Sequence, residues 1–234
     1  MKRILVTGAS KGIGFETVLA LCRQGCSVLA LSRDATGLSR LQDAVRAEQG
    51  EGRLATFQSD LLQLDTIPLL NWVNEEGRLD AVVNNAGLLI SKPFSELTPA
   101  DWQESFSVNL FGAVSLIQTL LPFLKQSAPA HIVNIGSMGG FQGSSKFPGL
   151  SAYSASKAAL ANLTECLAEE FKIWRIAVNC LALGAVQTEM LETAFPGYQA
   201  PLKKEEMGGF VAWFALNGGQ VFNGKILPVS VSTP

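Results

Sequence analysis

Short apolar segments alternate along the chain with longer segments whose apolar residues recur at helical spacing. The short segments are rich in Val, Ile and Leu and lack the apolar/polar alternation of a strand that faces water. They predict strands covered on both faces, and the segments between them predict crossover helices. The runs are RILVTG, SVLALSR, LDAVVNNAG, HIVNIGS, RIAVNCLALG and KILPVSV, with RLATFQSD as a weaker seventh. The pattern therefore predicts repeated βαβ units, a parallel sheet and an α/β fold.

Two segments interrupt this alternation, at residues 139–150 and 189–201, and both are predicted as loops. Each follows an apolar run, so each lies beyond the carboxyl end of a predicted strand, where ligands bind in parallel α/β sheets. The second loop is rich in apolar residues, with Met190 and Phe195 among them. Such a loop either packs into the core or covers a ligand as a lid, and the sequence leaves both open. No linker divides the chain, so residues 1–234 are predicted to form one domain.

Composition and charge narrow the range of partners. Hydrophobic residues make up 47% of the chain and charged residues 16%, which indicates a well-packed globular protein. The formal net charge is -2 and no basic run occurs, so we expect neither nucleic acid nor an anionic membrane as a partner. A small molecule fits better. The first apolar run is too short for a signal peptide or a membrane span, so the cytoplasm is the expected location.

Metal chemistry and histidine chemistry find little support. Four cysteines, Cys22, Cys26, Cys166 and Cys180, are dispersed and lack a second close pair or a histidine partner, which favours free thiols over metal ligands. The single histidine, His131, opens an apolar run and is predicted to be structural. We therefore expect no metal site and no histidine-containing nucleophilic triad.

A glycine-rich turn follows the first predicted strand and opens a predicted helix, FETVLALCRQG. Glycines permit a tight turn and let backbone amides approach a pyrophosphate, whose charge is favoured by the helix N-terminus. The last glycine allows close packing of helix and strand. The spacing is Gly-x-x-x-Gly-x-Gly, formed by Gly8, Gly12 and Gly14. This turn predicts a phosphate site for a nucleotide.

The stretch YSASK carries Tyr153 and Lys157 four residues apart, which is one face of a helix. Such a pair is common on exposed helix surfaces, and taken alone it would be assigned there. Removing the tyrosine proton at pH 7 requires lowering a pKa of about 10 by roughly three units, or about 4 kcal/mol. An ammonium at ~4 Å in an effective dielectric of ~20 supplies about that much. The pair is therefore also a candidate proton-transfer unit.

Four motifs in this order resemble the short-chain dehydrogenase/reductase family, in its shorter single-domain branch. They are the turn from Thr7 to Gly14, the segment Asn84 to Gly87, Ser137, and the pair Tyr153 and Lys157. The resemblance covers essentially the whole chain. It implies a single-domain, Rossmann-like three-layer sandwich around a central, mostly seven-stranded parallel sheet, and it implies an active oxidoreductase.

The resemblance also implies a role for each residue of the reaction centre. Tyr153 would act as general acid in carbonyl reduction and general base in alcohol oxidation, while Lys157 would hold the nicotinamide ribose. Ser137 would hydrogen-bond the substrate oxygen, or serve as a cap at the strand end. Asn109 falls within a predicted long helix, where asparagine is a poor interior residue, so its position suggests a local reason. In the family it would hold a water that links the lysine to solvent.

The end of the second strand, SVLALSRD, bears on the choice of nucleotide. A carboxylate there would bind the adenosine ribose, whereas a basic residue would accept the additional phosphate of NADP(H). Ser32 and Arg33 stand at this end and Lys11 precedes the second glycine of the turn, a combination typical of NADP(H) users in the family. Asp34 falls past the strand and is predicted to be a turn or cap residue. NADP(H) is therefore preferred, with NAD(H) possible.

Asp60 matches the family aspartate that contacts the adenine, and it also suits a helix cap. The cofactor-binding residues that the resemblance implies are Gly8, Ser10, Lys11, Gly12, Ile13, Gly14, Ser32, Arg33, Asp60, Leu61, Asn85, Ala86, Gly87, Tyr153, Lys157, Gly184, Val186 and Thr188. The residues expected around the substrate are Ser137, Phe141, Phe147, Tyr153, Met190 and Phe195. The aromatic and methionine side chains would make this pocket largely apolar.

The chain departs from the family pattern in three features. Leu183 stands where a proline usually precedes the glycine, the interval from Ser137 to Tyr153 is long, and the chain ends in ILPVSVSTP in place of a glycine-rich acidic turn. A homodimer or homotetramer is implied by the resemblance alone, and the altered end affects the usual tetramer contact.

The leading functional hypothesis is NADP(H)-dependent reduction of a ketone or aldehyde, or oxidation of the matching alcohol. A first alternative is 3-oxoacyl carrier-protein reduction, although docking an acidic carrier favours a basic patch and LPFLKQSAPAH offers only Lys125. A second alternative is a non-catalytic NADP(H)-binding sensor or interaction protein on the same fold.

Overall fold

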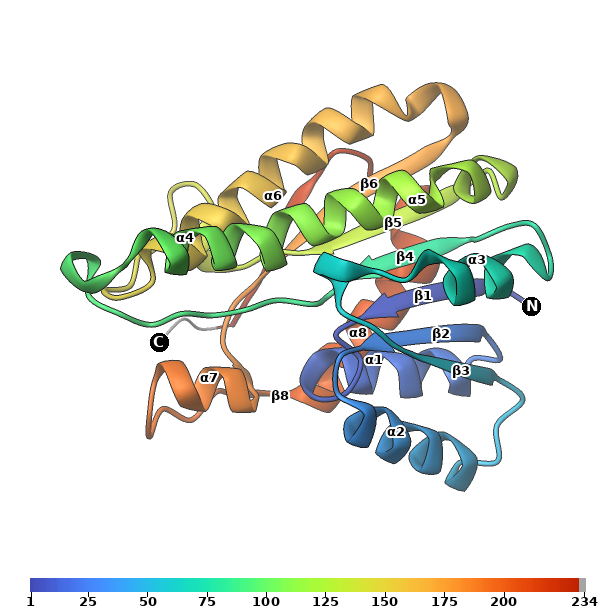
Figure 1. The fold of residues 1–234 in the computed structure, drawn as a ribbon, viewed down its shortest axis with the longest axis horizontal. Helices are drawn as coiled ribbons and strands as arrows, with labels where there is room; N and C mark the ends of the chain where they lie inside the picture. The colour runs from blue at the N-terminus through green and yellow to red at the C-terminus, as the bar shows by residue number, and fades with distance from the viewer. Residues whose placement is uncertain (232–234) are drawn as a thin grey trace.

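Seven parallel strands form the central sheet in the computed structural model, which describes residues 1–231 (Figure 1). The strands are β1 (Arg3–Thr7), β2 (Ser27–Ser32), β3 (Arg53–Gln58), β4 (Ala81–Asn84), β5 (Ala130–Ile135), β6 (Ile176–Leu183) and β9 (Ile226–Val229). Their order in the sheet is β3-β2-β1-β4-β5-β6-β9, and every pairing is parallel. The predicted sheet is confirmed. The weak run RLATFQSD forms β3, an edge strand that is only half-buried, which explains its weaker pattern.

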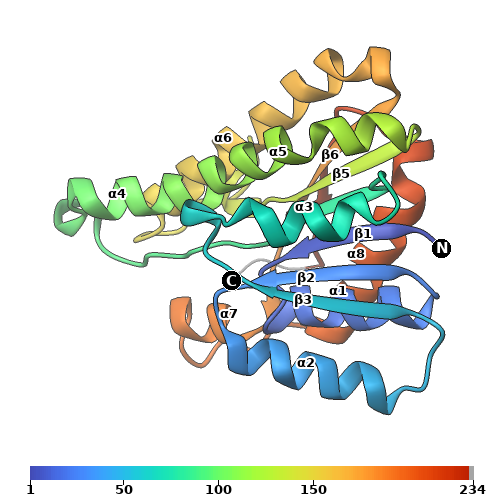
Figure 2. The ribbon, with the colours of Figure 1, turned by 45° about the vertical axis from the view of Figure 1, so that its right-hand side comes forward.

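Helices cover both faces of this sheet, as the three-layer prediction requires (Figures 1 and 2). The α-helices are α1 (Gly12–Arg23), α2 (Ala35–Ala47), α3 (Thr66–Asn74), α4 (Pro99–Phe106), α5 (Gly112–Gln126), α6 (Ser151–Glu170), α7 (Glu189–Ala194) and α8 (Lys204–Asn217). Helices α1, α2 and α8 lie on one face, and α3, α5 and α6 lie on the other. Successive residues of β1 divide between the two layers, because Ile4 and Val6 join one apolar cluster while Leu5 joins the other.

Several short elements complete the described chain. A second, two-stranded parallel sheet pairs β7 (Val186–Gln187) with β8 (Leu202–Lys203). The 3-10 helices are Leu61–Gln63, Phe94–Glu96, Met138–Gly140, Lys172–Trp174 and Gly218–Gln220, and a π-helix spans Ser107–Phe111. The predicted loop at 139–150 begins within the third of these turns. The first six residues of the predicted loop at 189–201 form helix α7, because the Thr188 hydroxyl accepts a hydrogen bond from Leu191 N at 3.3 Å and caps it.

The π-helix lies between α4 and α5 and joins them into one continuous helix, Pro99–Gln126, with mean hydropathy 1.6 in its most apolar window. By length and composition this helix could cross a membrane. Its apolar residues Leu116, Leu120 and Leu124 are fully buried against the sheet, however, as in the core helix of a globular domain. Asn109 lies within the π-helix, so the asparagine at this interior helix position coincides with an irregular turn.

Candidate active site

One cleft of about 570 Å³ opens at the carboxyl ends of the central strands. Strand β1 pairs with β2 on one side and with β4 on the other, so the strand order reverses there, which is where α/β sheets bind ligands. The cleft is within the size range of cofactor sites. Of all the residues predicted for cofactor, substrate and catalysis, every one lines this cleft except Gly14, Asn109 and Phe141.

The glycine turn packs so closely that larger residues would not fit. Gly8 has φ +65°, and a Cβ on it would lie 2.8 Å from Ala86 Cα. A Cβ on Gly14 would lie 2.4 Å from both Gly8 O and the Asn85 side-chain nitrogen. Asn85 holds the turn from the other side, because its amide donates to Thr7 O at 3.0 Å and to Gly8 O at 3.1 Å. This explains why Gly14 does not line the cleft although the turn depends on it.

The start of helix α1 suits a phosphate group. Its N-cap residue, Lys11, is in extended conformation and makes no side-chain cap hydrogen bond. The first N–H groups of a helix have no intrahelical acceptor, and they favour an anion when no side chain takes that role. The residues present at this end of the cleft therefore fit a dinucleotide pyrophosphate.

The end of the cleft at strands β2 and β3, where the adenosine would lie, is polar and contains both cationic and anionic side chains, among them Arg33 and Asp60. The Ser32 hydroxyl donates to the Ser10 hydroxyl at 2.9 Å, and the Arg33 guanidinium lies 3.6 Å from an Asp60 carboxylate oxygen. Arg33 is 62% exposed, so its charge is available to a ligand. Asp34 also lines this end, but its carboxylate accepts from Gly37 N at 3.0 Å and caps α2, as predicted.

Asp60 caps a short helix and also lines the cleft at the position expected for the adenine. Its carboxylate accepts a hydrogen bond from Leu62 N at 2.9 Å, so it caps the short 3-10 helix Leu61–Gln63. It also lines the cleft beside Leu61. The cap fixes the carboxylate at the end of β3, next to the Arg33 charge.

Helix α6 carries Tyr153 and Lys157 into the middle of the cleft, where both side chains are buried. The Lys157 ammonium donates a hydrogen bond to Ile135 O at 2.8 Å and lies 6.0 Å from the centroid of the Tyr153 ring. Burial lowers the pKa of Lys157 to about 8, since the charged form loses its hydration. The exposed surface pair considered as an alternative is wrong.

Burial also has the largest effect on the pKa of the Tyr153 hydroxyl. It raises the pKa of Tyr153, and the hydrogen bond with the Ser137 side chain acts in the opposite direction but is the smaller effect. The expected lowering of the Tyr153 pKa by the Lys157 charge is therefore not found in this structure. The pKa of Tyr153 rises because burial disfavours the charged phenolate. The sequence does not show that both side chains are buried.

Asn109 holds the reaction centre from behind the cleft. Its amide oxygen accepts from Leu88 N at 2.7 Å, and its amide nitrogen donates to Leu88 O and to the Ser156 hydroxyl, both at 2.9 Å. The Ser156 hydroxyl donates to Tyr153 O at 2.7 Å. A Cβ on Gly87 would lie 3.3 Å from both the Asn109 oxygen and the Lys157 ammonium, so these groups flank the same glycine. Sequence analysis missed Ser156, although it lies within YSASK.

The substrate end of the cleft brings together the two predicted loops. Phe147, Met190 and Phe195 line it, and the rings of Phe147 and Phe195 contact each other edge to face with centroids 5.5 Å apart. Phe141 does not line the cleft. The cleft is also lined by apolar residues that carry no motif and were not predicted as site residues: Leu89, Val108, Met138, Leu191 and Ala194.

Leu183 has a structural explanation. It is the last residue of β6, is 6% exposed, and pairs with Val229 of β9. Gly184 N then donates to Val229 O at 2.9 Å, which continues the contact beyond the strand. Leu183 therefore fills an apolar core position, and the segment after it carries Gly184, Val186 and Thr188 along the cleft as predicted.

Comparison with known proteins identifies a family and several relatives. The family model described as short chain dehydrogenase matches residues 2–199. YciK, an uncharacterized oxidoreductase of Escherichia coli (strain K12), is 37% identical over 202 aligned positions, in an alignment that covers 82% of this chain and 77% of the relative. A 3-oxoacyl-(acyl-carrier-protein) reductase of Synechocystis sp. is 31% identical over 236 aligned positions, in an alignment that covers 94% of this chain and 93% of the relative. The solved Pseudomonas aeruginosa RhlG/NADP active-site complex matches with TM-score 0.84 and 28% identity, covering 98% of this chain and 94% of that chain.

Proposed function

Because this chain belongs to the short-chain dehydrogenase/reductase family, we propose that it is an NADP(H)-dependent oxidoreductase that reduces a ketone or aldehyde, or oxidises the matching alcohol. The observation that carries the proposal is the cleft itself, in which Ser137, Tyr153 and Lys157 stand beside the glycine turn. A buried phenol next to a phosphate-binding turn is the arrangement that proton transfer coupled to hydride transfer requires.

In this mechanism the bound dinucleotide supplies or accepts the hydride. The Tyr153 hydroxyl gives its proton to the substrate oxygen during reduction and takes it back during oxidation. The Ser137 hydroxyl bonds the same oxygen and stabilises the charge that develops on it. Lys157 stays close to the phenol as a cation, so its charge stabilises the phenolate that remains after proton transfer.

Asn109 and Ser156 act on the position of Tyr153 within this mechanism. The hydrogen bond from Ser156 to Tyr153 O holds the first turn of α6, and Asn109 holds Ser156 against the backbone at Leu88. Both groups are buried, and buried hydrogen-bonded networks fix one side-chain geometry.

Preference for NADP(H) rests on the adenosine end of the cleft. Arg33 offers a largely exposed guanidinium, and the paired hydroxyls of Ser10 and Ser32 offer hydrogen bonds to a phosphate. The Asp34 carboxylate, which would repel a phosphate, is engaged in capping α2. The RhlG complex, which contains NADP, adds support from a relative of the same fold.

A second candidate is 3-oxoacyl carrier-protein reduction, favoured by the Synechocystis relative that carries this name and spans nearly all of the chain. Docking of an acidic carrier needs exposed cations near the cleft. Lys125, the cation considered for this role, has its ammonium 3.4 Å from the centroid of the Trp174 ring, so it is already engaged. We therefore rank this candidate below a small-molecule carbonyl substrate.

We also propose a homo-oligomer and a cytoplasmic location. Phe111, at the end of the π-helix that leads into α5, is 55% exposed, and α6 exposes the small residue Ala158, which suits contact with a second copy. All four cysteines have free thiols, which suits a reducing compartment. Size-exclusion chromatography with light scattering tests the first proposal, and Phe111→Asp is expected to shift the protein toward monomer.

The decisive experiment is an assay of NADPH and NADH oxidation against a panel of ketones and aldehydes, with Tyr153→Phe as the matched variant. We expect turnover with NADPH that the variant loses. Tight NADPH binding without turnover on any carbonyl compound would instead favour the non-catalytic sensor. Turnover that persists in Tyr153→Phe contradicts the assigned mechanism.

A further inference from the structure

The two loops that the sequence predicts beyond the sheet meet over the substrate end of the cleft. Phe147 comes from the segment between β5 and α6, and Phe195 follows α7. Their ring planes are inclined at 76°, an edge-to-face contact, and both rings are half-buried while lining the cleft. The contact therefore joins two segments that lie far apart in the sequence at the substrate end of the cleft.

The segment that carries Phe195 is a closed loop held at its neck. Strands β7 and β8 pair where the segment leaves and rejoins the fold, with Gln187 opposite Lys203. The Gln187 side chain strengthens the neck, since its amide nitrogen donates to Glu192 at 2.9 Å and its oxygen accepts from Ala200 N at 2.8 Å. Helix α7 stands away from the main sheet in Figure 1. Phe195, which directly follows α7, therefore contacts Phe147 from within a loop that is held at its own neck.

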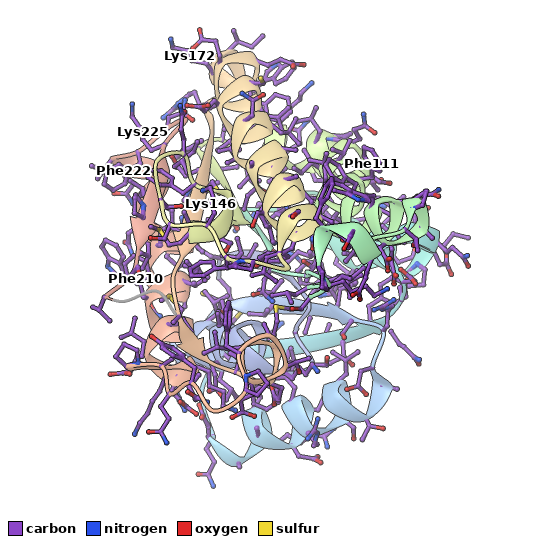
Figure 3. The ribbon with its side chains drawn as sticks, turned by 90° about the vertical axis from the view of Figure 1, so that its left-hand side faces the viewer. Phe111, Lys146, Lys172, Phe210, Phe222 and Lys225 are labelled. Carbon is purple, nitrogen blue, oxygen red and sulfur yellow. The ribbon has the colours of Figure 1, made fainter. Side chains whose placement is uncertain are left out.

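The two loops present apolar side chains and no cation to the cleft within the described part of the chain. Together with Met138 and Thr188, which directly precede them, the loops contribute Gly139, Phe147, Leu150, Glu189, Met190, Leu191, Ala194 and Phe195, and of all these residues only Glu189 is charged. Lys146 is next to Phe147 in sequence (Figure 3), but its ammonium donates to Phe141 O at 2.6 Å and to the Ser144 hydroxyl at 2.9 Å. This cation therefore braces its own loop. A carboxylate or phosphate group on the substrate would find no counter-charge from either loop.

We infer that Phe147 and Phe195 close as an aromatic pair over the substrate, and that the substrate is a neutral carbonyl compound with an apolar chain of several carbons. This inference rests on the proposed function and adds the substrate class to it. The rings separate to admit the chain and then pack against it, so the apolar group provides specificity while Tyr153 and Ser137 hold the carbonyl oxygen. Keto acids and sugar phosphates are disfavoured because their charge would be buried without a partner.

A matched substrate series tests the inference. The series is 2-butanone to 2-octanone, with 7-oxooctanoate as the same chain ending in a carboxylate. We expect kcat/KM to rise about fourfold per added CH2, the equivalent of ~0.8 kcal/mol for each buried CH2. We expect 7-oxooctanoate to be at least about 100-fold poorer than 2-octanone, because its charge is buried unpaired. A flat series, or equal rates for the two eight-carbon substrates, overturns the inference.

Variants test the aromatic pair itself. Phe147→Ala and Phe195→Ala are each expected to flatten the chain-length series, and the double variant to do little more than either one, because both truncations open the same closure. Phe141→Ala is the matched control, since Phe141 belongs to the same loop as Phe147 but does not line the cleft. Where an alanine variant fails to fold, Phe147→Leu or Phe195→Leu keeps apolar volume and should shift the series partially. An unchanged series in both variants contradicts the proposal.

A binding measurement separates this inference from the proposed function. Calorimetric titration of 2-octanol into the protein saturated with NADPH reports closure without turnover, because an alcohol and the reduced cofactor cannot exchange a hydride. Binding that weakens about tenfold or more in Phe195→Ala but stays unchanged in Phe141→Ala supports the aromatic closure even if no ketone is reduced. Ketone turnover together with equal affinity for 2-octanol in wild type and Phe195→Ala would leave the proposed function standing and refute the closure.

Discussion

The amide nitrogen of Asn109 donates a hydrogen bond of 2.9 Å to the Ser156 hydroxyl, which in turn donates to the backbone carbonyl of Tyr153 at 2.7 Å. Asn109 lies in a π-helical turn and Ser156 in α6, so two helices on the same face of the sheet are joined directly behind the candidate general acid. The widened turn is what brings the asparagine side chain inward at this point.

Ser156→Ala should therefore affect both stability and rate. Removing the hydroxyl leaves a buried amide and a carbonyl each with one partner fewer, which costs about 1 kcal/mol of unfolding free energy. Because Tyr153 is less firmly held, we expect kcat for a good ketone to fall about three- to tenfold with KM changed less. Urea unfolding and steady-state kinetics measure the two effects.

Ser154→Ala is the control for this prediction, because Ser154 is two residues away on the same helix and does not line the cleft. It should leave kcat close to wild type. A drop in stability for Ser156→Ala with no change in kcat would show that the network is purely structural.

Burial of the Lys157 ammonium is expected to destabilise the folded protein. Its pKa is about 8 when folded against 10.5 for a free lysine, so the folded state binds its proton more weakly than the unfolded state does. The loss of unfolding free energy caused by burying the charge is complete below pH 8, the pKa in the folded protein. It disappears as pH rises toward 10.5, the pKa in the unfolded chain. A difference of this size corresponds to about 3 kcal/mol, partly offset by about 1 kcal/mol for the hydrogen bond to Ile135 O.

Lys157→Met should thus raise the unfolding free energy by about 2 kcal/mol at pH 7 while abolishing turnover. The stability gap between variant and wild type should shrink at pH 10, where the wild-type side chain is neutral in the fold. Chemical denaturation at the two pH values, each time comparing variant with wild type, measures it. If the variant is less stable than wild type at pH 7, the packing contacts of the Lys157 side chain stabilise the fold by more than the burial of its charge destabilises it.

The reaction centre and the turn were predictable from sequence because their chemistry is local. Tyr153 and Lys157 share a helix face by spacing alone, and Gly8 and Gly14 recur at the spacing of a tight turn. What the sequence could not provide depends on contacts between distant segments. The exclusion of Phe141 from the cleft, the meeting of Phe147 with Phe195 and the direction of the Tyr153 pKa shift all follow from how the loops and helices pack.

Arg33→Ala tests the basis of cofactor choice. If the guanidinium meets the additional phosphate of NADP(H), its loss should raise KM for NADPH about tenfold or more and leave KM for NADH nearly unchanged. Arg46→Ala removes the same charge from α2 at a side chain that is 75% exposed, and it should change neither value. Parallel weakening of both nucleotides in Arg33→Ala would assign the arginine to general affinity instead of selectivity.

Two glycines should respond to alanine in opposite directions. A Cβ on Gly14 would lie 2.4 Å from backbone and amide atoms of the turn, so Gly14→Ala should cost about 1–3 kcal/mol of stability and weaken NADPH binding strongly. Gly209 lies within α8 with nothing within 4 Å of a Cβ, so Gly209→Ala should stabilise the protein by up to about 1 kcal/mol with normal NADPH binding. Thermal unfolding and fluorescence titration measure both. Equal effects at the two positions would show that the close approach at Gly14 is relieved by backbone movement.

His131 should make the fold sensitive to acid. The Asn179 oxygen accepts from Lys225 N at 3.0 Å, so its amide nitrogen must donate to His131 Nε2, also at 3.0 Å. Nε2 is therefore an acceptor and Nδ1 carries the proton, which it donates to Ala215 O at 3.2 Å. This neutral tautomer joins β5, β6 and α8, and protonation would turn Nε2 into a second donor facing a donor.

Burial lowers the pKa of His131 from 6.5 to about 4, and the nearby charge of Lys2 acts in the same direction more weakly. Below pH 6.5 the imidazole is protonated in the unfolded chain, whereas in the folded protein it stays neutral down to about pH 4. The free energy of unfolding therefore falls by up to about 3 kcal/mol between pH 6.5 and pH 4. His131→Gln cannot titrate, so its unfolding free energy should decline less between pH 6.5 and 4 even if it starts lower. Because carboxylates contribute equally to both proteins, the difference between the two pH curves isolates the imidazole. Curves that run parallel would show that His131 takes up its proton in the fold as readily as in the unfolded chain, which would require the Asn179 amide to be reversed and its bond from Lys225 N to be lost.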